Sequence, residues 1–196
     1  MPRLEPLPRD ALREFEPALK GVERAMGFVP NSLLTLARKP DILRAALGLF
    51  QAIQQPGSIP PPLKSMIANV ASQAAGCRYC QAHTGHTAAH VGVAEDKLTA
   101  LWNFEDSPLF DAAEKAALRV ARDAAQVPNA VSDEEFAALR EHFAPDAVVE
   151  IVAVISMFGF LNRWNDTIAT ELESSPLAFA RERLTEYGWS AGKHAP

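Results

Sequence analysis

The chain has 196 residues, of which 48% are hydrophobic and 22% charged, and its formal net charge is −5. This length suffices for one substantial hydrophobic core, or for two small lobes that share one. Positive and negative charges are mixed along the sequence, so we expect no nucleic-acid partner and no membrane partner. The longest apolar run, residues 147–161, is shorter than the roughly 20 residues that cross a bilayer, which favours a buried core helix.

The cysteine content points to a reducing compartment. The N-terminus lacks the apolar segment of a signal peptide, so we expect a cytoplasmic protein. Two cysteines are too few for a disulfide framework in a chain of this size. They are therefore expected to serve redox chemistry or metal binding.

Apolar residues recur at helical spacing, and few segments show the alternation of β-strands. The sequence predicts an all-α protein with helices at about residues 8–26, 30–37, 40–53, 63–75, 78–90, 95–103, 111–125, 132–142, 145–171 and 176–187. The proline-rich segment 55–62 separates an N-terminal helical arm, 1–56, from a core, 57–196, within one compact unit. The tail 190–196 is expected to fray.

A weak internal repeat relates two apolar helices. A shift of 85 residues aligns them and places Cys77 on Asn162 and Cys80 on Asn165. Chance is one explanation, because buried helices share their periodicity. The other is a pseudo-repeated helical hairpin, in which one copy keeps the thiols and the other keeps a polar partner site.

Both cysteines belong to a C-x-x-C motif that follows Gly76 at the start of the predicted helix 78–90. The reactive form is the thiolate, and a free cysteine titrates at about 8.5. The helix N-terminus and His83, one turn after Cys80, are both able to stabilise this anion. No Asp or Glu lies between Ile42 and Ala94 to oppose it. The second cysteine is then placed to convert a sulfenic acid or mixed disulfide into an intramolecular disulfide.

The other interpretations of the motif are a zinc site and a pair of inert core cysteines. On one helix, His83, His86 and His90 point in directions that do not converge with both cysteines on one ion. Free cysteines are often small core residues, but a pair that opens a helix after glycine favours redox chemistry. We therefore expect no metal. Because no glycine-rich phosphate loop is present, the sequence indicates no nucleotide or other cofactor.

Residues 63–92 resemble the AhpD-like family, which includes the carboxymuconolactone decarboxylases. They carry a core helix, Gly-Cys-x-Tyr-Cys, a histidine-bearing helix and a Gly-Val turn. Residues 160–163 resemble a second segment of that family, and residues 30–31 with their flanking arm resemble its peroxidase-related members. The resemblance implies an AhpD-like helical fold and homo-oligomers (dimer, trimer or hexamer). It also implies a peroxidase or disulfide oxidoreductase that reduces small hydroperoxides and is regenerated by an external thiol or dithiol.

The resemblance also implies roles for the cysteines. In the family pattern Cys80 is the reactive thiol, Cys77 resolves it, and a histidine and a glutamate relay protons. The helix dipole favours Cys77 instead, but His83 is nearer to Cys80, so we follow the family. This sequence departs from the pattern twice, with Ser65 at the position of the glutamate and Thr84 at that of the histidine.

The two departures require substitutes for the proton relay. We expect His83 to act as the histidine. We expect Glu150 to act as the acid, because it is the repeat equivalent of Ser65 and interrupts an apolar run. Further pocket residues are expected to be Ser65, Tyr79, His86, Asn162 and Asn165.

Two other functions compete with the peroxidase. One is a cofactor-free decarboxylase like the family's other branch, although that chemistry needs no C-x-x-C. The other is a redox-responsive oligomer with little turnover. Peroxide consumption that depends on Cys80 would separate the first function from these two.

Overall fold

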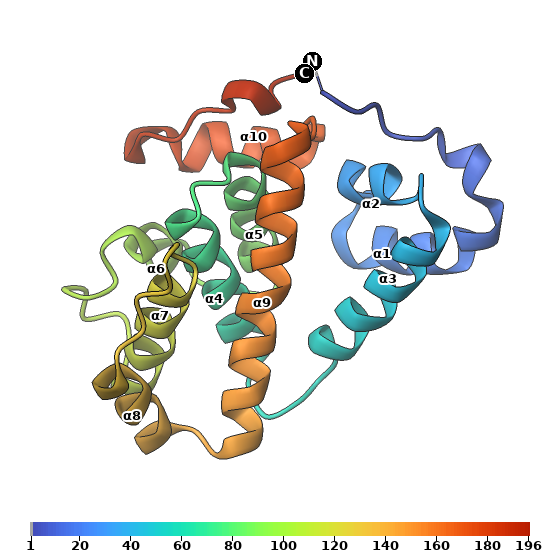
Figure 1. The fold of residues 1–196 in the computed structure, drawn as a ribbon. Coiled ribbons are helices and arrows are strands. Elements are labelled where there is room, and N and C mark those ends of the chain that lie inside the picture. Colours follow the sequence, from blue (N-terminus) through green and yellow to red (C-terminus); the bar gives the residue numbers. More distant parts are fainter. Residues whose placement is uncertain (1) are drawn as a thin grey trace.

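The computed structural model describes residues 2–196, and within them every regular element is helical, as predicted. The elements, drawn in Figure 1, are η1 (Arg9–Phe15), α1 (Glu16–Met26), α2 (Asn31–Leu36), α3 (Pro40–Gln54), α4 (Pro61–Ala74), α5 (Arg78–His90), α6 (Glu95–Ala100), η2 (Leu101–Asn103), α7 (Ala112–Ala124), α8 (Asp133–His142), α9 (Pro145–Ile168), α10 (Ser174–Arg183), η3 (Thr185–Tyr187) and η4 (Gly192–His194).

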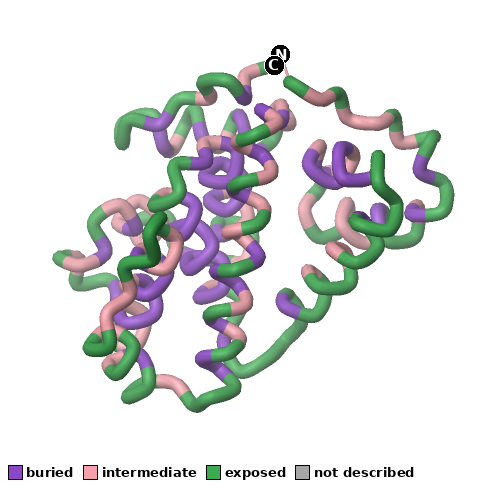
Figure 2. The backbone as a smooth tube through the Cα atoms, viewed as in Figure 1, coloured by how far each residue is buried: buried purple, intermediate pink, exposed green. Residues whose placement is uncertain are grey.

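Helix α4 forms the centre of the molecule. Residues 63–72 of this helix are all buried, and the tube in Figure 2 is coloured by this burial. It packs against α5, α7 and α9 through an apolar cluster to which it contributes Leu63, Met66, Ile67 and Val70. Removing about 25 cal/mol per Å² of apolar surface from water is the main force that holds these four helices together.

The turn between α4 and α5 depends on Gly76. Its φ is +72°, in the left-handed region that side chains with a Cβ adopt only with strain. The turn ends α4 and brings the start of α5 back along it, with Cys77 as the N-terminal capping residue. The C-x-x-C motif therefore lies inside the core rather than on an exposed loop.

The N-terminal arm, η1 to α3, lies beside α9 and packs around its own apolar cluster (Figure 1). It is attached to α9 by a hydrogen bond from Trp164 Nε1 to Thr35 Oγ1 of 3.1 Å, and by the rings of Phe50 and Phe160, whose centroids are 6.3 Å apart. The division at residue 56 stays a prediction, but the arm and α9 are joined by specific side chains.

The proline-rich linker after α3 is held by a buried ion pair. Lys64 Nζ donates to the carbonyl oxygens of Ile53 and Gln55, both at 2.7 Å, and pairs with the carboxylate of Glu150. The same carboxylate accepts a 2.7 Å bond from the Ser58 N–H. The linker is therefore fastened to both α4 and α9.

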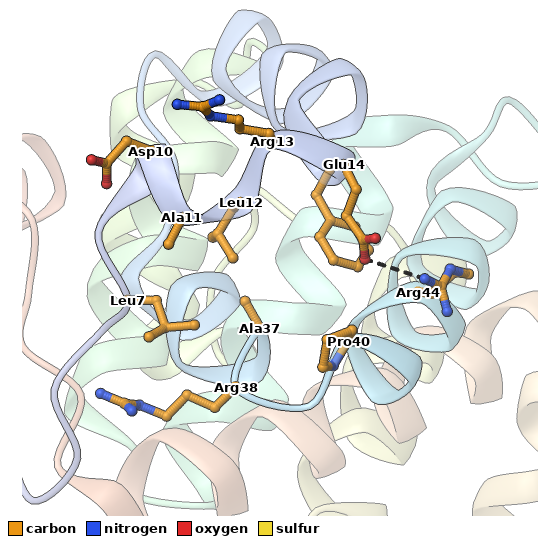
Figure 3. A pocket seen from close by; sticks show the side chains of 11 residues that line it. Leu7, Asp10, Ala11, Leu12, Arg13, Glu14, Ala37, Arg38, Pro40 and Arg44 are labelled. Carbon is orange, nitrogen blue, oxygen red and sulfur yellow. Dashed lines mark hydrogen bonds and ion pairs between the residues drawn. The ribbon is translucent and has the colours of Figure 1, made fainter.

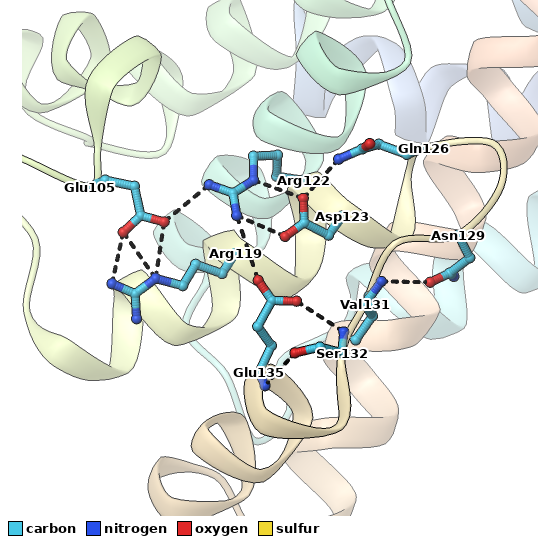
Figure 4. A network of polar contacts seen from close by, with 9 residues as sticks. All are labelled: Glu105, Arg119, Arg122, Asp123, Gln126, Asn129, Val131, Ser132 and Glu135. Atoms are coloured by element: carbon cyan, nitrogen blue, oxygen red, sulfur yellow. Dashed lines mark hydrogen bonds and ion pairs between the residues drawn. The ribbon is translucent and has the colours of Figure 1, made fainter.

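A second polar network holds α7 and α8, as Figure 4 shows. Glu105 accepts bonds from Arg119 and Arg122, while Arg122 also pairs with Asp123 and with Glu135. The network joins the loop after η2 to α7 and to the start of α8. Its role is to hold these elements together.

The C-terminal tail differs from the prediction that it frays. The Leu172 N–H donates to the carbonyl of His194 at 2.9 Å, and the His194 side chain is fully buried. Trp189, also buried, donates its Nε1–H to the carbonyl of Arg78 at 3.1 Å. These anchors fasten the tail beside the start of α5, so two large buried side chains outweigh the usual fraying of a terminus.

Helix α9 ends at Ile168 rather than near 171, because Ala169 adopts a left-handed conformation with a φ of +52°. The chain then turns into a short loop, residues 169–173, that runs beside α5. By length and composition α9 is able to cross a membrane, with a mean hydropathy of 1.5. A single such helix is weak evidence, because the core helix of a soluble protein meets the same test.

Candidate functional site

The two thiols lie buried at the N-terminus of α5. Both cysteines are free, and neither side chain is more than 2% exposed. The Cys80 N–H donates to Cys77 Sγ at 3.3 Å, so the sulfur of Cys77 caps the helix. Cys77 Sγ therefore lies against the positive end of the α5 dipole.

The sulfur of Cys80 has a different partner, the side-chain amide of Asn165 on α9. Asn165 Nδ2 lies 3.4 Å from Cys80 Sγ, and its Oδ1 accepts a 2.8 Å bond from the Thr170 hydroxyl, which fixes the orientation of the amide. Burial, followed by the neighbouring Cys77, raises the pKa of Cys80 well above its ordinary value, and Asn165 partly opposes this. The resting thiol of Cys80 is therefore protonated at neutral pH.

A histidine–glutamate pair lies one helical turn further along α5. His83 Nε2 is 2.6 Å from Glu173 Oε2, and the ring of His83 stacks on that of Tyr79 with centroids 4.2 Å apart. The Tyr79 hydroxyl donates to Glu173 Oε1 at 2.8 Å, and the Asn31 N–H of the arm donates to the same oxygen. Within residues 2–196, no hydrogen bond joins His83 to either sulfur.

Glu173 is a charged acid despite its burial. Burial by itself would raise the pKa of this carboxyl, but the charge and hydrogen bond of His83, together with the Asn31 N–H, bring the pKa below its usual value. A carboxylate placed in this way orients an imidazole and stabilises the imidazolium formed when the ring takes up a proton. The pair is therefore suited to acid–base chemistry.

Three aromatic rings lie on the outer side of this pair. The Phe28 ring lies edge-on to His83, with centroids 5.4 Å apart, and 5.9 Å from the ring of His86. The Phe179 ring lies edge-on to His86 at 6.0 Å. Burial, followed by His83, lowers the pKa of His86, so this ring is neutral at neutral pH. Phe28, His86 and Phe179 are all half-buried, unlike the thiols.

The structure does not bring Glu150 to the thiols, which corrects the expectation that it is the acid of the relay. It lies fifteen positions before Asn165 on α9, or roughly 22 Å along the helix axis. Its carboxylate is occupied by Lys64 and by the N–H groups of Ser58 and Ile59. The acid beside His83 is Glu173 instead.

Of the other residues expected in the pocket, Asn165 contacts a sulfur, whereas Ser65 does not. The Ser65 hydroxyl donates to the carbonyls of Pro61 and Pro62, within its own helix. Asn162 is buried one turn before Asn165, and within residues 2–196 its amide nitrogen and oxygen have no hydrogen-bond partner. The repeat aligned Cys80 with Asn165, and these two side chains do meet.

Two cavities lie away from the sulfurs. One of about 860 Å³, shown in Figure 3, lies in the arm and carries several charged side chains, among them Arg13, Arg38 and Arg44. The other, of about 380 Å³, lies between α4, α5, α6 and α10 and is bordered by Gly85 and Phe179. Neither is lined by a cysteine. Within residues 2–196, no three His, Cys, Asp or Glu side chains are grouped to hold a metal ion.

The sequence interpretation missed Glu173 and Phe28. One signal pointed to a remote acid: the segment from Ile42 to Ala94 has no carboxylate, so any partner of His83 had to come from elsewhere. Nothing in the local pattern singled out Phe28, because the folded arm brings it to α5.

Comparison with known proteins shows the family of the chain. A model of the carboxymuconolactone decarboxylase family matches residues 40–123, which include both cysteines. The crystal structure of the debrominase Bmp8 is similar over 91% of this chain and 96% of that one, with 37% identity and a TM-score of 0.87. The chain belongs to the carboxymuconolactone decarboxylase family. The fold is the AhpD-like helical fold, as the resemblance implied.

Two further relatives extend the comparison. A peroxidase-related protein from Ralstonia eutropha JMP134, described as an AhpD core, is 27% identical with a TM-score of 0.73, over 89% of this chain and 90% of that one. The uncharacterized protein YnjA from Escherichia coli K12 is 30% identical over 108 residues, which are 55% of this chain and 59% of YnjA. The match thus covers less than two thirds of YnjA. A Bmp8 variant with one cysteine replaced by alanine was crystallised with 2,3,4-tribromopyrrole.

Proposed function

We propose that this family member is a thiol-dependent reductase of small hydroperoxides, with Cys80 as the attacking thiol and Cys77 as the resolving one. The observation that carries the proposal is the pair of free thiols at the start of α5, one turn from a buried His83–Glu173 pair. A dithiol supplies two electrons, and the acid–base pair supplies and removes protons.

The proposed reaction has two steps. The sulfur of Cys80 attacks the terminal oxygen of the hydroperoxide, so that an S–O bond forms, the O–O bond breaks, and the thiol proton ends on the departing alkoxide as an alcohol. The sulfur of Cys77 then attacks the sulfenic acid, so that an S–S bond forms and water leaves. The two thiols have then lost two electrons and form a disulfide, which an external thiol or dithiol reduces back to the thiols.

His83 and Glu173 serve the proton transfers of both steps. The resting Cys80 thiol must lose its proton, since burial raises its pKa. The imidazole of His83 lies one turn away and accepts this proton through the bound substrate or a water, and Glu173 stabilises the resulting imidazolium. The imidazolium then protonates the alkoxide. Glu173 thereby takes the role for which Glu150 was expected.

A second candidate substrate class is a brominated aromatic compound, which the similarity to Bmp8 favours. The electrons balance with the same residues. The carbon–bromine bond becomes a carbon–hydrogen bond, two thiols become a disulfide, and bromide and one proton are released. His83 is placed to deliver the proton that the carbon requires.

Other features of the proposal are expectations that follow from the sequence. They are a cytoplasmic location, assembly into homo-oligomers, an external thiol or dithiol as reductant, and no requirement for a metal or cofactor. A decarboxylase that does not use the thiols, and a redox-responsive oligomer with little turnover, are the alternatives that the experiment must separate.

Purified protein is assayed with dithiothreitol and a hydroperoxide, and in parallel with 2,3,4-tribromopyrrole and detection of bromide. Substrate loss is expected with the wild type and none with Cys80→Ser. In a parallel assay of pre-reduced protein without dithiothreitol, Cys77→Ser is expected to give a single turnover and to retain a sulfenic acid detectable with dimedone. Circular dichroism checks that each variant is folded. Turnover that survives Cys80→Ser would overturn the proposal, and a disulfide that forms without turnover would favour the redox-responsive oligomer.

A further inference from the structure

We propose that Phe28, His86 and Phe179 form an aromatic entrance that selects substrates whose reducible bond is attached to a flat, uncharged ring. This inference rests on the proposed thiol chemistry and adds a substrate class to it. For hydroperoxides the preferred substrates are arylalkyl hydroperoxides, in which the O–O bond is one carbon from the ring, with hydrogen peroxide the poorest.

The geometry of the rings suits an aromatic guest. The edge of Phe28 is directed at His83 with an interplanar angle of 76°, and His86 and Phe179 meet at 85°. Aromatic rings prefer such edge-to-face and offset arrangements, and each pair contributes about 0.5–1.5 kcal/mol beyond the burial of its surface. The outer faces and edges of these rings are the apolar surface that a further ring would contact.

The entrance lies within two helical turns of Cys80 along α5. His83 and His86 follow Cys80 by three and six positions on α5, which is roughly 4.5 and 9 Å along the axis. Cys80 is buried, whereas Phe28, His86 and Phe179 are half-buried. A ring held near His86 therefore directs a bond on its substituent inward, past His83, towards Cys80.

The three rings of the entrance carry no charge that would pair with an ionic substrate. No Asp or Glu occurs between Ile42 and Ala94, and burial keeps His86 neutral. The nearby carboxylate, Glu173, is already occupied by His83, Tyr79 and the N–H of Asn31. Nothing in this ring of side chains pairs with an ionic tail.

The ring of Phe179 occupies space that is open because residue 85 is a glycine. A Cβ on Gly85 would lie 2.8 Å from Phe179 Cε1, closer than such atoms approach. Phe179 also borders the cavity of about 380 Å³ between α4, α5, α6 and α10. The glycine therefore lets Phe179 lie against α5, and the cavity leaves space into which its ring can turn when a substrate enters.

Phe28 is contributed by the arm, which is locked to the site. Asn31 donates its N–H to Glu173 and its Nδ2–H to the carbonyl of Glu171, the latter at 3.0 Å. The same carboxylate therefore positions both His83 and the loop that carries Phe28. Substrate selection and proton transfer share this residue.

The test compares kcat/KM for cumene hydroperoxide, tert-butyl hydroperoxide and hydrogen peroxide. The wild type is expected to prefer cumene hydroperoxide, and Phe28→Leu or Phe179→Leu should lower the ratio of cumene hydroperoxide to hydrogen peroxide roughly 10-fold, through KM. The matched control, Phe136→Leu on the surface of α8, should leave the ratio unchanged. Equal use of cumene and tert-butyl hydroperoxides, or an unchanged ratio in both variants, would overturn the proposal.

A binding measurement separates this inference from the proposed reaction. The unreactive alcohol 2-phenyl-2-propanol is added to the Cys80→Ser variant, with tert-butanol as the control, and the ring proton signals of His86 are followed by NMR. A shift with the phenyl alcohol alone supports the entrance, even if the wild type consumes no hydroperoxide. No shift, or equal shifts with both alcohols, contradicts it.

Discussion

The molecule contains two partly buried pairs of a carboxylate and a basic side chain, Lys64–Glu150 and His83–Glu173. In each pair the carboxylate also accepts backbone N–H groups, and in each its pKa lies below the usual value although burial opposes this. One pair fastens the linker before α4, and the other lies beside the thiols.

The difference between the pairs lies in the base. Lys64 is 3% exposed and donates to two backbone carbonyls as well as to Glu150, so its charge is fully used in holding the fold. His83 has an imidazole, the side chain whose charge changes near neutral pH, and it lies next to the aromatic rings and one turn from Cys80. In the proposed reaction, the acid is structural in the first pair and chemical in the second.

The largest expected effect is a difference in kcat between variants of the two acids. Glu173→Gln should lower kcat with a hydroperoxide on the order of 10²-fold, because His83 loses the charge that stabilises its protonated form. Glu150→Gln is the matched control, since its amide oxygen still accepts the N–H groups of Ser58 and Ile59. Steady-state kinetics measures both. A loss in Glu150→Gln as large as that in Glu173→Gln would abolish the distinction.

The next largest effect concerns the unfolding free energy and the Lys64–Glu150 pair. Glu150→Leu leaves the buried ammonium of Lys64 without its counter-ion, and breaking such a pair costs about 3 kcal/mol of unfolding free energy. Urea unfolding measures the cost. The double variant Lys64→Met with Glu150→Leu should recover much of it, because no unpaired charge remains. If the double variant were no more stable than Glu150→Leu, the ion pair would not be what fastens the linker.

The pH dependence of the unfolding free energy tests whether Glu173 is charged in the folded chain. Its pKa is lowered in the folded chain, so its contribution is present above the unfolded pKa and is lost as the pH falls through the folded pKa. The stability difference between the wild type and Glu173→Gln should therefore shrink as the pH is lowered from 6 towards 3. Denaturant midpoints across this range provide the measurement. A difference that grows on acidification would mean that the carboxyl is protonated in the native state.

The local elements of this comparison could be predicted from the sequence, whereas its long-range contacts could not. Gly76 and the C-x-x-C correctly placed the start of α5, because capping and helix breaking depend on neighbouring residues. Glu173 is ninety positions from His83 and reaches it only because Ala169 ends α9 in a left-handed turn, a conformation that alanine seldom adopts. Glu150 was misleading because an acid in an apolar run signals a partner without indicating which one, and the partner is Lys64.

Neither pair bonds to the sulfur of Cys80, and the side chain that donates to this sulfur is the neutral amide of Asn165. Asn165→Leu should raise the pKa of Cys80 further, since the amide is the group that lowers it, and should slow alkylation by iodoacetamide at pH 8 by roughly 2- to 10-fold, the equivalent of one hydrogen bond. Thr170→Val, which keeps the amide but frees its orientation, should give a smaller decrease. Alkylation of the Cys77→Ser background isolates this thiol. An unchanged rate in Asn165→Leu would shift the search for the stabilising group to Cys77 and the N-terminus of α5.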